Sequence, residues 1–448
     1  MIDKAEALAR CQDLVALARA RGADAADAAF RGESADSISV RLGALEDASR
    51  SESEGIGLRL FAGRRSATVQ TSDFSAGAFP ALVERALEMA RRTPEDPYAA
   101  LAPTDLLHRG EVPDLDLADG TEPSPAELRE WAAECEDAAR AITGVTNSNG
   151  ASAGASRSVS ALATSHGVAK ATEATGRALS ASVIAGAGST MQTDHAWRSA
   201  RHAADLPPAG EIGREAGERA VARVGPSTIA GRNLPVVFDP RVGSGIISHL
   251  IGAMSGAAAA RKASFLLGHE AEQLLDPAIR IMEDPLRLRG LASRAIDGEG
   301  LATRPRALVE QGRIFGWLTN TAAARQLEAP LTGHAVRGVG GAPGIATANV
   351  YMEPGEVTPE GLMDGIAEGL YVTDLFGQGV NLVTGDYSRG AAGFRIVNGA
   401  LAGPVAEITI AGHLLAMLRA LTPANDLEFH RGLDVPTLRV DGMTIASS

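Results

Sequence analysis

Residues 369–412 read GLYVTDLFGQGVNLVTGDYSRGAAGFRIVNGALAGPVAEITIAG, a run of β-type residues interrupted by glycines. Within it, Asn398-Gly399 suits a two-residue hairpin turn of type I′, in which both residues adopt positive φ. Four segments of this run have the composition of strands: 372–373, 380–384, 394–397 and 404–408. The sequence therefore predicts a glycine-rich antiparallel sheet in this region.

Length, charge and cysteine content limit the classes of protein to consider. A chain of 448 residues exceeds the usual single hydrophobic core, so two or three domains are expected. Its 42 Lys and Arg against 55 Asp and Glu give a net charge of −13, which argues against direct nucleic-acid binding. Only Cys11 and Cys135 occur, and the first residues, MIDKAEALAR, lack the apolar core of a signal peptide. These features predict a reduced, cytoplasmic setting.

Shifts in composition along the chain predict a multi-domain α+β fold. Residues 1–95 combine helical periodicity over 3–21 and 79–89 with strand patterns, which indicates an N-terminal α+β domain with Cys11 in its packing. The proline- and acid-rich residues 96–125 are expected to form a linker. We then expect a central domain of antiparallel strands and helices over 126–230, and a C-terminal domain of mostly antiparallel sheet over 231–448.

One segment, 242–260, lacks Asp, Glu, Lys and Arg and contains the word Gly-Ala-Met-Ser-Gly at 252–256. Such a run could be a membrane span. It is rich in Gly, Ala and Ser rather than Leu and Ile, and it contains His249, so we interpret it as a buried, closely packed Gly/Ala helix. No membrane association is expected.

Several long words of this sequence resemble one known family over most of the chain. They are SRSESEGIGLR at 49–59, SHLIGAMSG at 248–256, SFL at 264–266 and the whole of 369–412. The chain resembles the TldE (PmbA) branch of the TldD/PmbA family, whose members are bacterial subunits of a cytoplasmic zinc peptidase. The resemblance implies peptide hydrolysis as the outcome of the assembly to which this chain contributes.

The common zinc-peptidase motif HExxH is absent from the sequence. It places two histidines at i and i+4 on one helical face, with a glutamate that activates zinc-bound water. The chain has one His-Glu word, His269-Glu270, but Gln273 stands where HExxH needs histidine, and Leu274 stands where HExxxH needs it. We interpret His269-Glu270 as a solvated helix start.

The resemblance also implies where a metal helix would lie. The catalytic sister subunit, TldD, carries HExxxH on a helix that aligns with the Gly/Ala helix of this chain. Here His249 is kept, but Leu250 replaces the glutamate and Met254 replaces the second histidine. We therefore expect no catalytic or metal-binding residue and no cofactor in this chain, with zinc held by the partner. His249 is either a packed core histidine or a remnant that lines a groove.

A group of polar and small residues in the C-terminal run could contact a peptide. A glycine-rich sheet lets an extended chain approach and pair by β-augmentation. The candidate groove residues are Asp374, Asp386, Tyr387, Ser388, Arg389 and Gly390. The alternative is ordinary turn chemistry at 386–390, and both interpretations stay open. The word Asp386-Tyr387-Ser388-Arg389-Gly390 lacks the first glycine of a serine-hydrolase elbow.

These observations lead to one main functional hypothesis and two alternatives. The main hypothesis is a catalytically silent, TldE-like subunit that pairs with a TldD-like metallopeptidase subunit and helps to admit unfolded or modified peptides. A homodimer of the isolated chain is left open. The alternatives are a non-enzymatic regulator of the gyrase-modulator type, and a stand-alone metallopeptidase with a metal held by scattered side chains.

Overall fold

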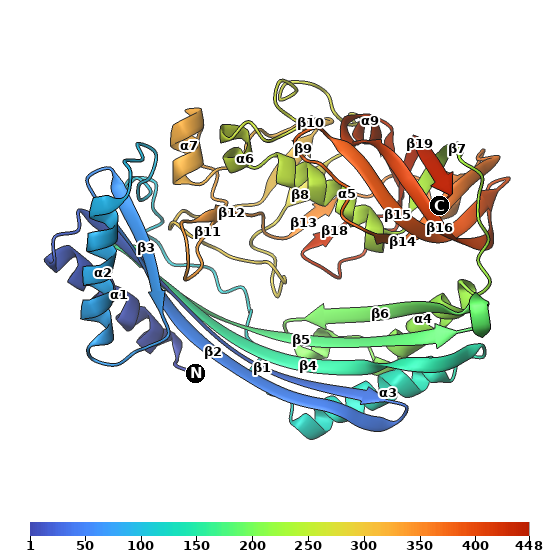
Figure 1. Ribbon diagram of the computed structural model, residues 1–448, viewed down its shortest axis with the longest axis horizontal. Helices are drawn as coiled ribbons and strands as arrows, with labels where there is room; N and C mark the ends of the chain where they lie inside the picture. The colour runs from blue at the N-terminus through green and yellow to red at the C-terminus, as the bar shows by residue number, and fades with distance from the viewer. Residues whose placement is uncertain (448) are drawn as a thin grey trace.

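The computed structural model describes residues 1–447 and consists of a long curved β-sheet with a second region packed over its concave face (Figure 1). The sheet has six antiparallel strands in the order β3-β2-β1-β4-β5-β6. Their bounds are β1 Ala25–Arg41, β2 Ala44–Ala62, β3 Arg65–Thr71, β4 Val145–Thr164, β5 Ala169–Ala185 and β6 Gln192–Ala200. Strands β1 and β2 are longer than the strand patterns of the sequence, which cover 37–42 and 55–61.

The large sheet contains strands from both sides of residues 96–125, the segment that the sequence indicated as a linker between domains. Strand β1 pairs with β2 on one side and with β4 on the other, from Asp27 opposite Thr164 to Val40 opposite Ala151. Residues 96–124 run as irregular chain between α2 and α3, which begins at Pro125. The N-terminal and central segments therefore share one sheet.

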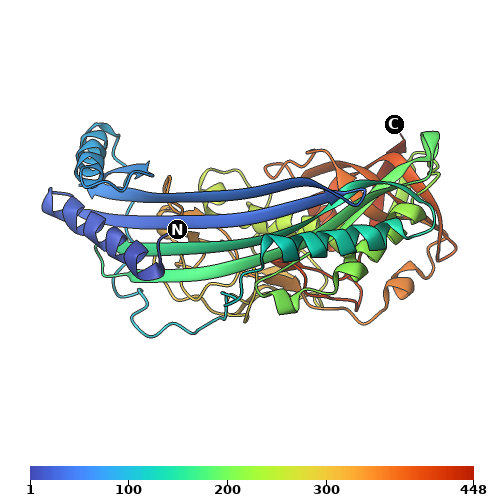
Figure 2. The same cartoon turned by 90° about the horizontal axis from the view of Figure 1, so that it is seen from below.

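Four helices cover the convex face of the sheet in two pairs. They are α1 Lys4–Ala20 and α2 Ala78–Arg92 over one half, and α3 Pro125–Arg140 and α4 Ala209–Ala222 over the other. Figure 2 shows α1, in dark blue, and α3, in teal, lying over the strands at the two ends of the sheet. Cys11 and Cys135 are both fully buried against the sheet, each on one of these helices, which confirms Cys11 as a packing residue.

The C-terminal region is built on a second, mostly antiparallel sheet of six strands, in the order β16-β15-β14-β7-β19-β17. Their bounds are β7 Arg232–Phe238, β14 Glu368–Phe376, β15 Asp386–Val397, β16 Ala400–His413, β17 Leu421–Pro423 and β19 Leu438–Ser447. Helix α5 Pro240–Ala253 packs on one face through the largest hydrophobic cluster of the protein. The α+β fold class expected from the sequence is confirmed.

Smaller elements complete the C-terminal region. The strands of a five-stranded sheet are β8 Ile281–Glu283, β9 Arg306–Glu310, β10 Arg313–Ile314, β13 Val350–Met352 and β18 Leu433–Asp434. A two-stranded sheet contains β11 Ala335–Val336 and β12 Gly344–Ile345. The remaining helices are α6 Gly256–Ala260, α7 Thr321–Leu327, α8 Pro359–Met363 and α9 Leu414–Arg419.

Local sequence signals succeeded and failed within the same run of residues. The hairpin between β15 and β16 turns at Asn398 and Gly399, with φ of 51° and 81°, which confirms the type I′ prediction. The predicted strand at 380–384 is wrong, since this segment is irregular and Val380 makes one isolated bridge to Tyr387. Of the two interpretations left open for 386–390, the turn does not hold, because these residues begin strand β15.

The Gly/Ala helix expected over 242–260 is buried but broken. Helix α5 ends at Ala253, Ser255 bridges to Leu318, and the chain resumes as α6. Within α5, Ile246, Ile247 and Leu250 point into the core, as expected for a packed helix. Among residues 1–447, no helix is long and apolar enough to cross a membrane.

One end of the concave sheet is fastened to the C-terminal region by a buried carboxylate shared between two arginines. Asp27 of β1 accepts hydrogen bonds from Arg59 Nε at 2.6 Å and from Arg337 Nε at 2.8 Å. Next to this cluster the backbone of Val339 lies directly on β2, because a Cβ added to Gly57 would be 1.7 Å from the Val339 carbonyl oxygen. Glycine at 57 is therefore required by the close approach of two backbones.

We expect Gly57→Ala to lower the free energy of unfolding by roughly 1–3 kcal/mol, because the methyl group would force residues 338–344 away from β2. Equilibrium urea unfolding would measure the change. Gly338→Ala is the matched control, since a Cβ there meets nothing within 4 Å, and it should change stability by less than about 0.5 kcal/mol. Equal effects of the two substitutions would contradict this account.

Candidate functional site

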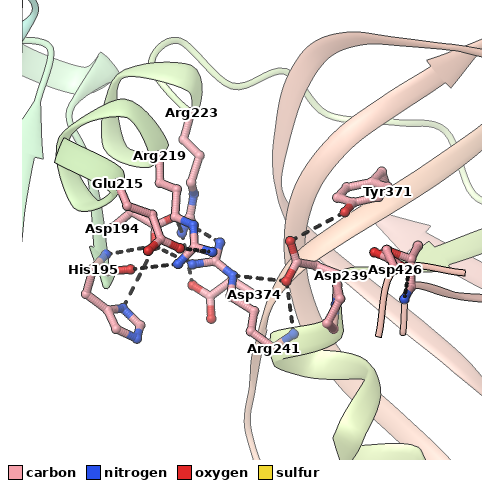
Figure 3. A network of polar contacts seen from close by, with 12 residues as sticks. Asp194, His195, Glu215, Arg219, Arg223, Asp239, Arg241, Tyr371, Asp374 and Asp426 are labelled. Carbon is pink, nitrogen blue, oxygen red and sulfur yellow. Dashed lines mark hydrogen bonds and ion pairs between the residues drawn. The ribbon is translucent and has the colours of Figure 1, made fainter. Parts of the chain in front are cut away.

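A second buried carboxylate fastens the other end of the concave sheet to the C-terminal region (Figure 3). Asp194 of β6 accepts hydrogen bonds from Arg241 of α5, Nη1 to Oδ1 at 2.7 Å and Nη2 to Oδ2 at 3.1 Å. It also pairs with Arg223, at the end of α4, at 3.2 Å. The Asp194 side chain is 1% exposed and the two arginine side chains are 9% and 10% exposed. One negative charge therefore lies between two positive charges, largely out of contact with bulk water.

The charges in this cluster hold each other in their ionised forms. Burial by itself would raise the pKa of Asp194, but the hydrogen bonds and positive charge of Arg241, with the charge of Arg223, outweigh it and lower that pKa. Burial by itself would lower the pKa of Arg241, but the hydrogen bonds that its guanidinium donates to Asp194, with the charge of Asp194, raise that pKa. The cluster also fixes the start of α5, where Asp239 caps the helix by accepting from the Arg241 backbone N–H at 2.9 Å.

The structure places Asp374, one of the candidate peptide contacts, in this same cluster. Its Oδ2 accepts from Arg223 Nη1 at 3.2 Å, although the two residues are 151 positions apart in the sequence. The Asp374 side chain is 42% exposed, so one side of the carboxylate still faces solvent. Its contact with Arg223 links β14 to the central segment.

Of the expected metal-helix positions, His249 and Leu250 lie on α5 and Met254 caps its C-terminal end, and the three side chains differ in burial. Leu250 and Met254 are 1% and 0% exposed and belong to the main hydrophobic core. His249 is half-buried, with its ring edge-on to Tyr387 at 6.2 Å between centroids. Burial, with a smaller effect of the Arg389 charge, lowers the pKa of His249, so its imidazole is neutral at pH 7.

These side chains do not fit a zinc site. Zinc in proteins needs at least three ligands from Cys, His, Asp or Glu. Across residues 1–447, no group of three or more such side chains is close enough together to hold a metal ion. Near His249, the neighbouring helical positions supply hydrocarbon and thioether groups that point into the core. The imidazole can therefore donate or accept a hydrogen bond, but it has no partner ligand.

The remaining candidate groove residues are divided between two faces of strand β15. Side chains alternate along a strand, so Tyr387 and Arg389 lie on the side of α5, while Asp386 and Ser388 lie on the other side and are exposed. Asp386 accepts from Thr384 Oγ1 at 2.6 Å. Gly390 lies against the ring of Phe376, because a Cβ there would be 2.3 Å from that ring. The candidate residues therefore do not form one cluster.

A hollow that the sequence analysis missed lies on the concave face of the large sheet. Its volume is about 540 Å³, and its lining comes from β1, β2, β4, β5 and β6. Ser39, Ser152 and Ser180 contribute hydroxyl groups, and His195 and Trp197 contribute rings. The alternation of Ser with Ala in β4 indicated a strand with one polar and one apolar face. It did not indicate which residues of β1 and β5 would pair with these serines.

Comparison with known proteins identifies the class to which this architecture belongs. Three models of the PmbA/TldA metallopeptidases match the chain: domain 1 over residues 26–90, the central domain over 118–224 and the C-terminal domain over 231–447. The chain therefore belongs to the PmbA/TldD metallopeptidase family. This confirms the resemblance found in the sequence.

Individual relatives agree with this assignment over almost the whole chain. The metalloprotease PmbA of Escherichia coli O157:H7 is 35% identical, covering 94% of this chain and 92% of that protein. A PmbA homologue of Haemophilus influenzae is 36% identical, covering 97% and 94%. A crystal structure from Bacteroides thetaiotaomicron, described as a candidate modulator of DNA gyrase, has a TM-score of 0.90 at 25% identity and full coverage of both chains.

A further structural neighbour shares the fold. TldE from Thermococcus kodakarensis matches with a TM-score of 0.84 and 22% identity, covering 97% of this chain and 99% of that one. At this level of identity the likeness concerns the fold alone. The coverage of both chains means that the long sheet and the C-terminal region are both part of the shared fold.

We expect Asp194→Asn to lower the free energy of unfolding by roughly 3–5 kcal/mol, because two buried guanidinium groups would lose their counter-charge. Urea unfolding at pH 7 would measure this. Because the folded pKa of Asp194 lies below its unfolded value, its contribution is complete above about pH 4 and is lost as the pH falls through the folded pKa. The difference between wild type and variant should therefore shrink in acid.

The control for this substitution is Asp13→Asn, which changes an exposed carboxylate on α1 and should leave stability within about 0.5 kcal/mol of wild type. A difference between wild type and Asp194→Asn that stays constant down to pH 2 would contradict the assigned ionisation.

Proposed function

We propose that this chain is the non-catalytic subunit of a zinc peptidase, in which a TldD-like partner supplies the metal, the general base and both imidazoles. The single observation that carries this proposal is the composition of α5, where His249 stands beside Leu250 and Met254 in the core. Relatives named metalloproteases support a role in proteolysis. The resemblance of the sequence words at 49–59, 248–256 and 369–412 to the TldE branch supports an assembly with a TldD-like subunit.

In this proposal the chain forms part of the substrate chamber and supplies no catalytic group. The concave sheet forms part of the wall of a chamber, and the C-terminal region held over it narrows the space through which an unfolded or modified peptide passes. The two cysteines are free and buried, which suits the reducing cytoplasm in which we place the complex.

Arg389 is the residue of the C-terminal sheet best placed to contact the peptide. It lies on the α5 side of β15 near His249, and its Nε bonds to the Phe376 carbonyl oxygen at 3.2 Å. The guanidinium has further donors that could bind a peptide carbonyl. A neutral imidazole beside it could accept or donate one more hydrogen bond.

The purified chain alone should not cleave an unstructured peptide, whereas adding a zinc-loaded TldD-like subunit should produce cleavage that a chelator abolishes. The reason is that water activation needs the metal and base of the partner. Release of a fluorogenic peptide product would measure the reaction, and the TldD-like subunit alone is the control. Chelator-sensitive cleavage by the isolated chain would contradict the proposal. Gyrase binding by the chain without any partner would favour a regulatory function instead.

In the active mixture, Arg389→Gln should raise KM for the peptide about tenfold, because a hydrogen bond from a charged donor would be lost. Asp386→Asn is the control from the same strand and should leave KM within about twofold, because its side chain lies on the other face. Steady-state kinetics with both variants would test this. An unchanged KM for Arg389→Gln would exclude Arg389 as a substrate contact.

A further inference from the structure

We propose that the hollow on the concave sheet is a binding subsite for an extended, uncharged peptide segment, with Trp197 stacking against an aromatic side chain of that segment. The inference rests on the proposed function and names a substrate contact within the chamber wall. It is carried by the cavity, by the register of the strands that line it and by the surroundings of the indole ring.

The strand register places hydroxyl groups and the indole in one line. Ser39 of β1 lies opposite Ser152 of β4, Ser152 lies opposite Ser180 of β5, and Ser180 lies opposite Trp197 of β6. Directly opposite residues project from the same face of a sheet. Four adjacent strands at about 4.8 Å spacing span about 14 Å, which matches roughly four residues of extended peptide.

Three of the four residues in this row, Ser39, Ser152 and Ser180, have small and polar side chains. The Oγ atoms of Ser39 and Ser152 are 2.7 Å apart, and each hydroxyl keeps further hydrogen-bonding capacity for a ligand. The next row across the sheet contains Gly150 opposite Ser182, and Ser182 lies opposite His195. Small side chains let a peptide backbone approach the sheet closely. Hydroxyl groups can then bond its N–H and C=O groups whatever its sequence.

The indole of Trp197 supplies the one large apolar surface of the hollow. The residue is 38% exposed, and the guanidinium carbon of Arg431, from the C-terminal region, lies 5.4 Å from its ring centroid. A cation already over the ring disfavours a second cation from the ligand. An aromatic ligand side chain adds stacking without that repulsion.

The charges at the rim do not select an ionic ligand either. Arg198 is bonded to Glu215 at 2.8 Å, and Glu46 lies 3.7 Å from Arg41. These two charged groups of the lining are thus paired within the protein. We therefore assign the site to a neutral segment with one aromatic side chain, since Arg198 and Glu46 are already paired and Arg431 disfavours a basic ligand at the ring.

The test uses the full-length chain with Trp131→Phe and Trp317→Phe, which leaves Trp197 as the single tryptophan. Its fluorescence is titrated with a ten-residue peptide of Gly, Ser and Ala that carries one central Phe, and with the same peptide carrying Ala instead. We expect a saturable change with the Phe peptide and binding about fivefold weaker with the Ala peptide. Equal binding of the two peptides would overturn the proposal. It would also fail if a neutral oligosaccharide changed the emission and neither peptide did.

Anisotropy of a labelled Phe peptide supplies a second readout in otherwise wild-type protein. Trp197→Ala should weaken binding about fivefold, and Trp197→Phe should restore most of it. Phe315→Ala is the matched control, since Phe315 is an exposed aromatic side chain with Arg306 at 5.2 Å over its ring, and it should not change binding. Unchanged binding by Trp197→Ala would overturn the assignment.

The outcomes separate this inference from the proposed function. If the chain binds the peptide through Trp197 but does not support cleavage with any TldD-like partner, the proposed function is wrong and the subsite stands. If the mixture cleaves the peptide but substitution of Trp197 does not change peptide binding, the subsite is wrong and the proposed function stands.

Discussion

Two buried aspartates, each shared by two arginines, hold the C-terminal region over the concave face of the long sheet. Asp27 at one end and Asp194 at the other are almost completely buried, so their ionic contacts are little screened by water or salt. Losing one partner would leave charges buried without compensation, so each cluster resists separation of the two regions. The space between them therefore has fixed walls.

The chemistry of that space follows from the sheet that forms one of its walls. Helices bury many apolar side chains of the sheet on the convex face, and serines, glycines and alanines of β4 and β5 lie on the concave face beside His195 and Trp197 of β6. A wall of small polar residues offers hydrogen bonds and close approach without strong preference for sequence. This property of the wall supports the proposal that the chain helps to admit unfolded peptides.

Local signals in the sequence predicted the elements whose geometry is set locally. The hairpin at Asn398-Gly399 depends on two residues that tolerate positive φ, and helix α1 depends on an apolar period and an Asp3 cap. The strand expected at 380–384 failed because no neighbouring strand pairs with it beyond one bridge. The extent of β1 and β2 was missed, since segments rich in Ser and Glu become strands only through pairing with each other.

By itself, the sequence determined the α+β class and the family, because these depend on residue identity and short-range spacing. The tertiary structure decided which residues meet. It joined Asp374 to Arg223 across 151 positions and aligned Ser39 with Trp197 through three strand pairings. Such contacts depend on the register of distant strands, and a change of register by one residue would turn every side chain of a strand to the opposite face.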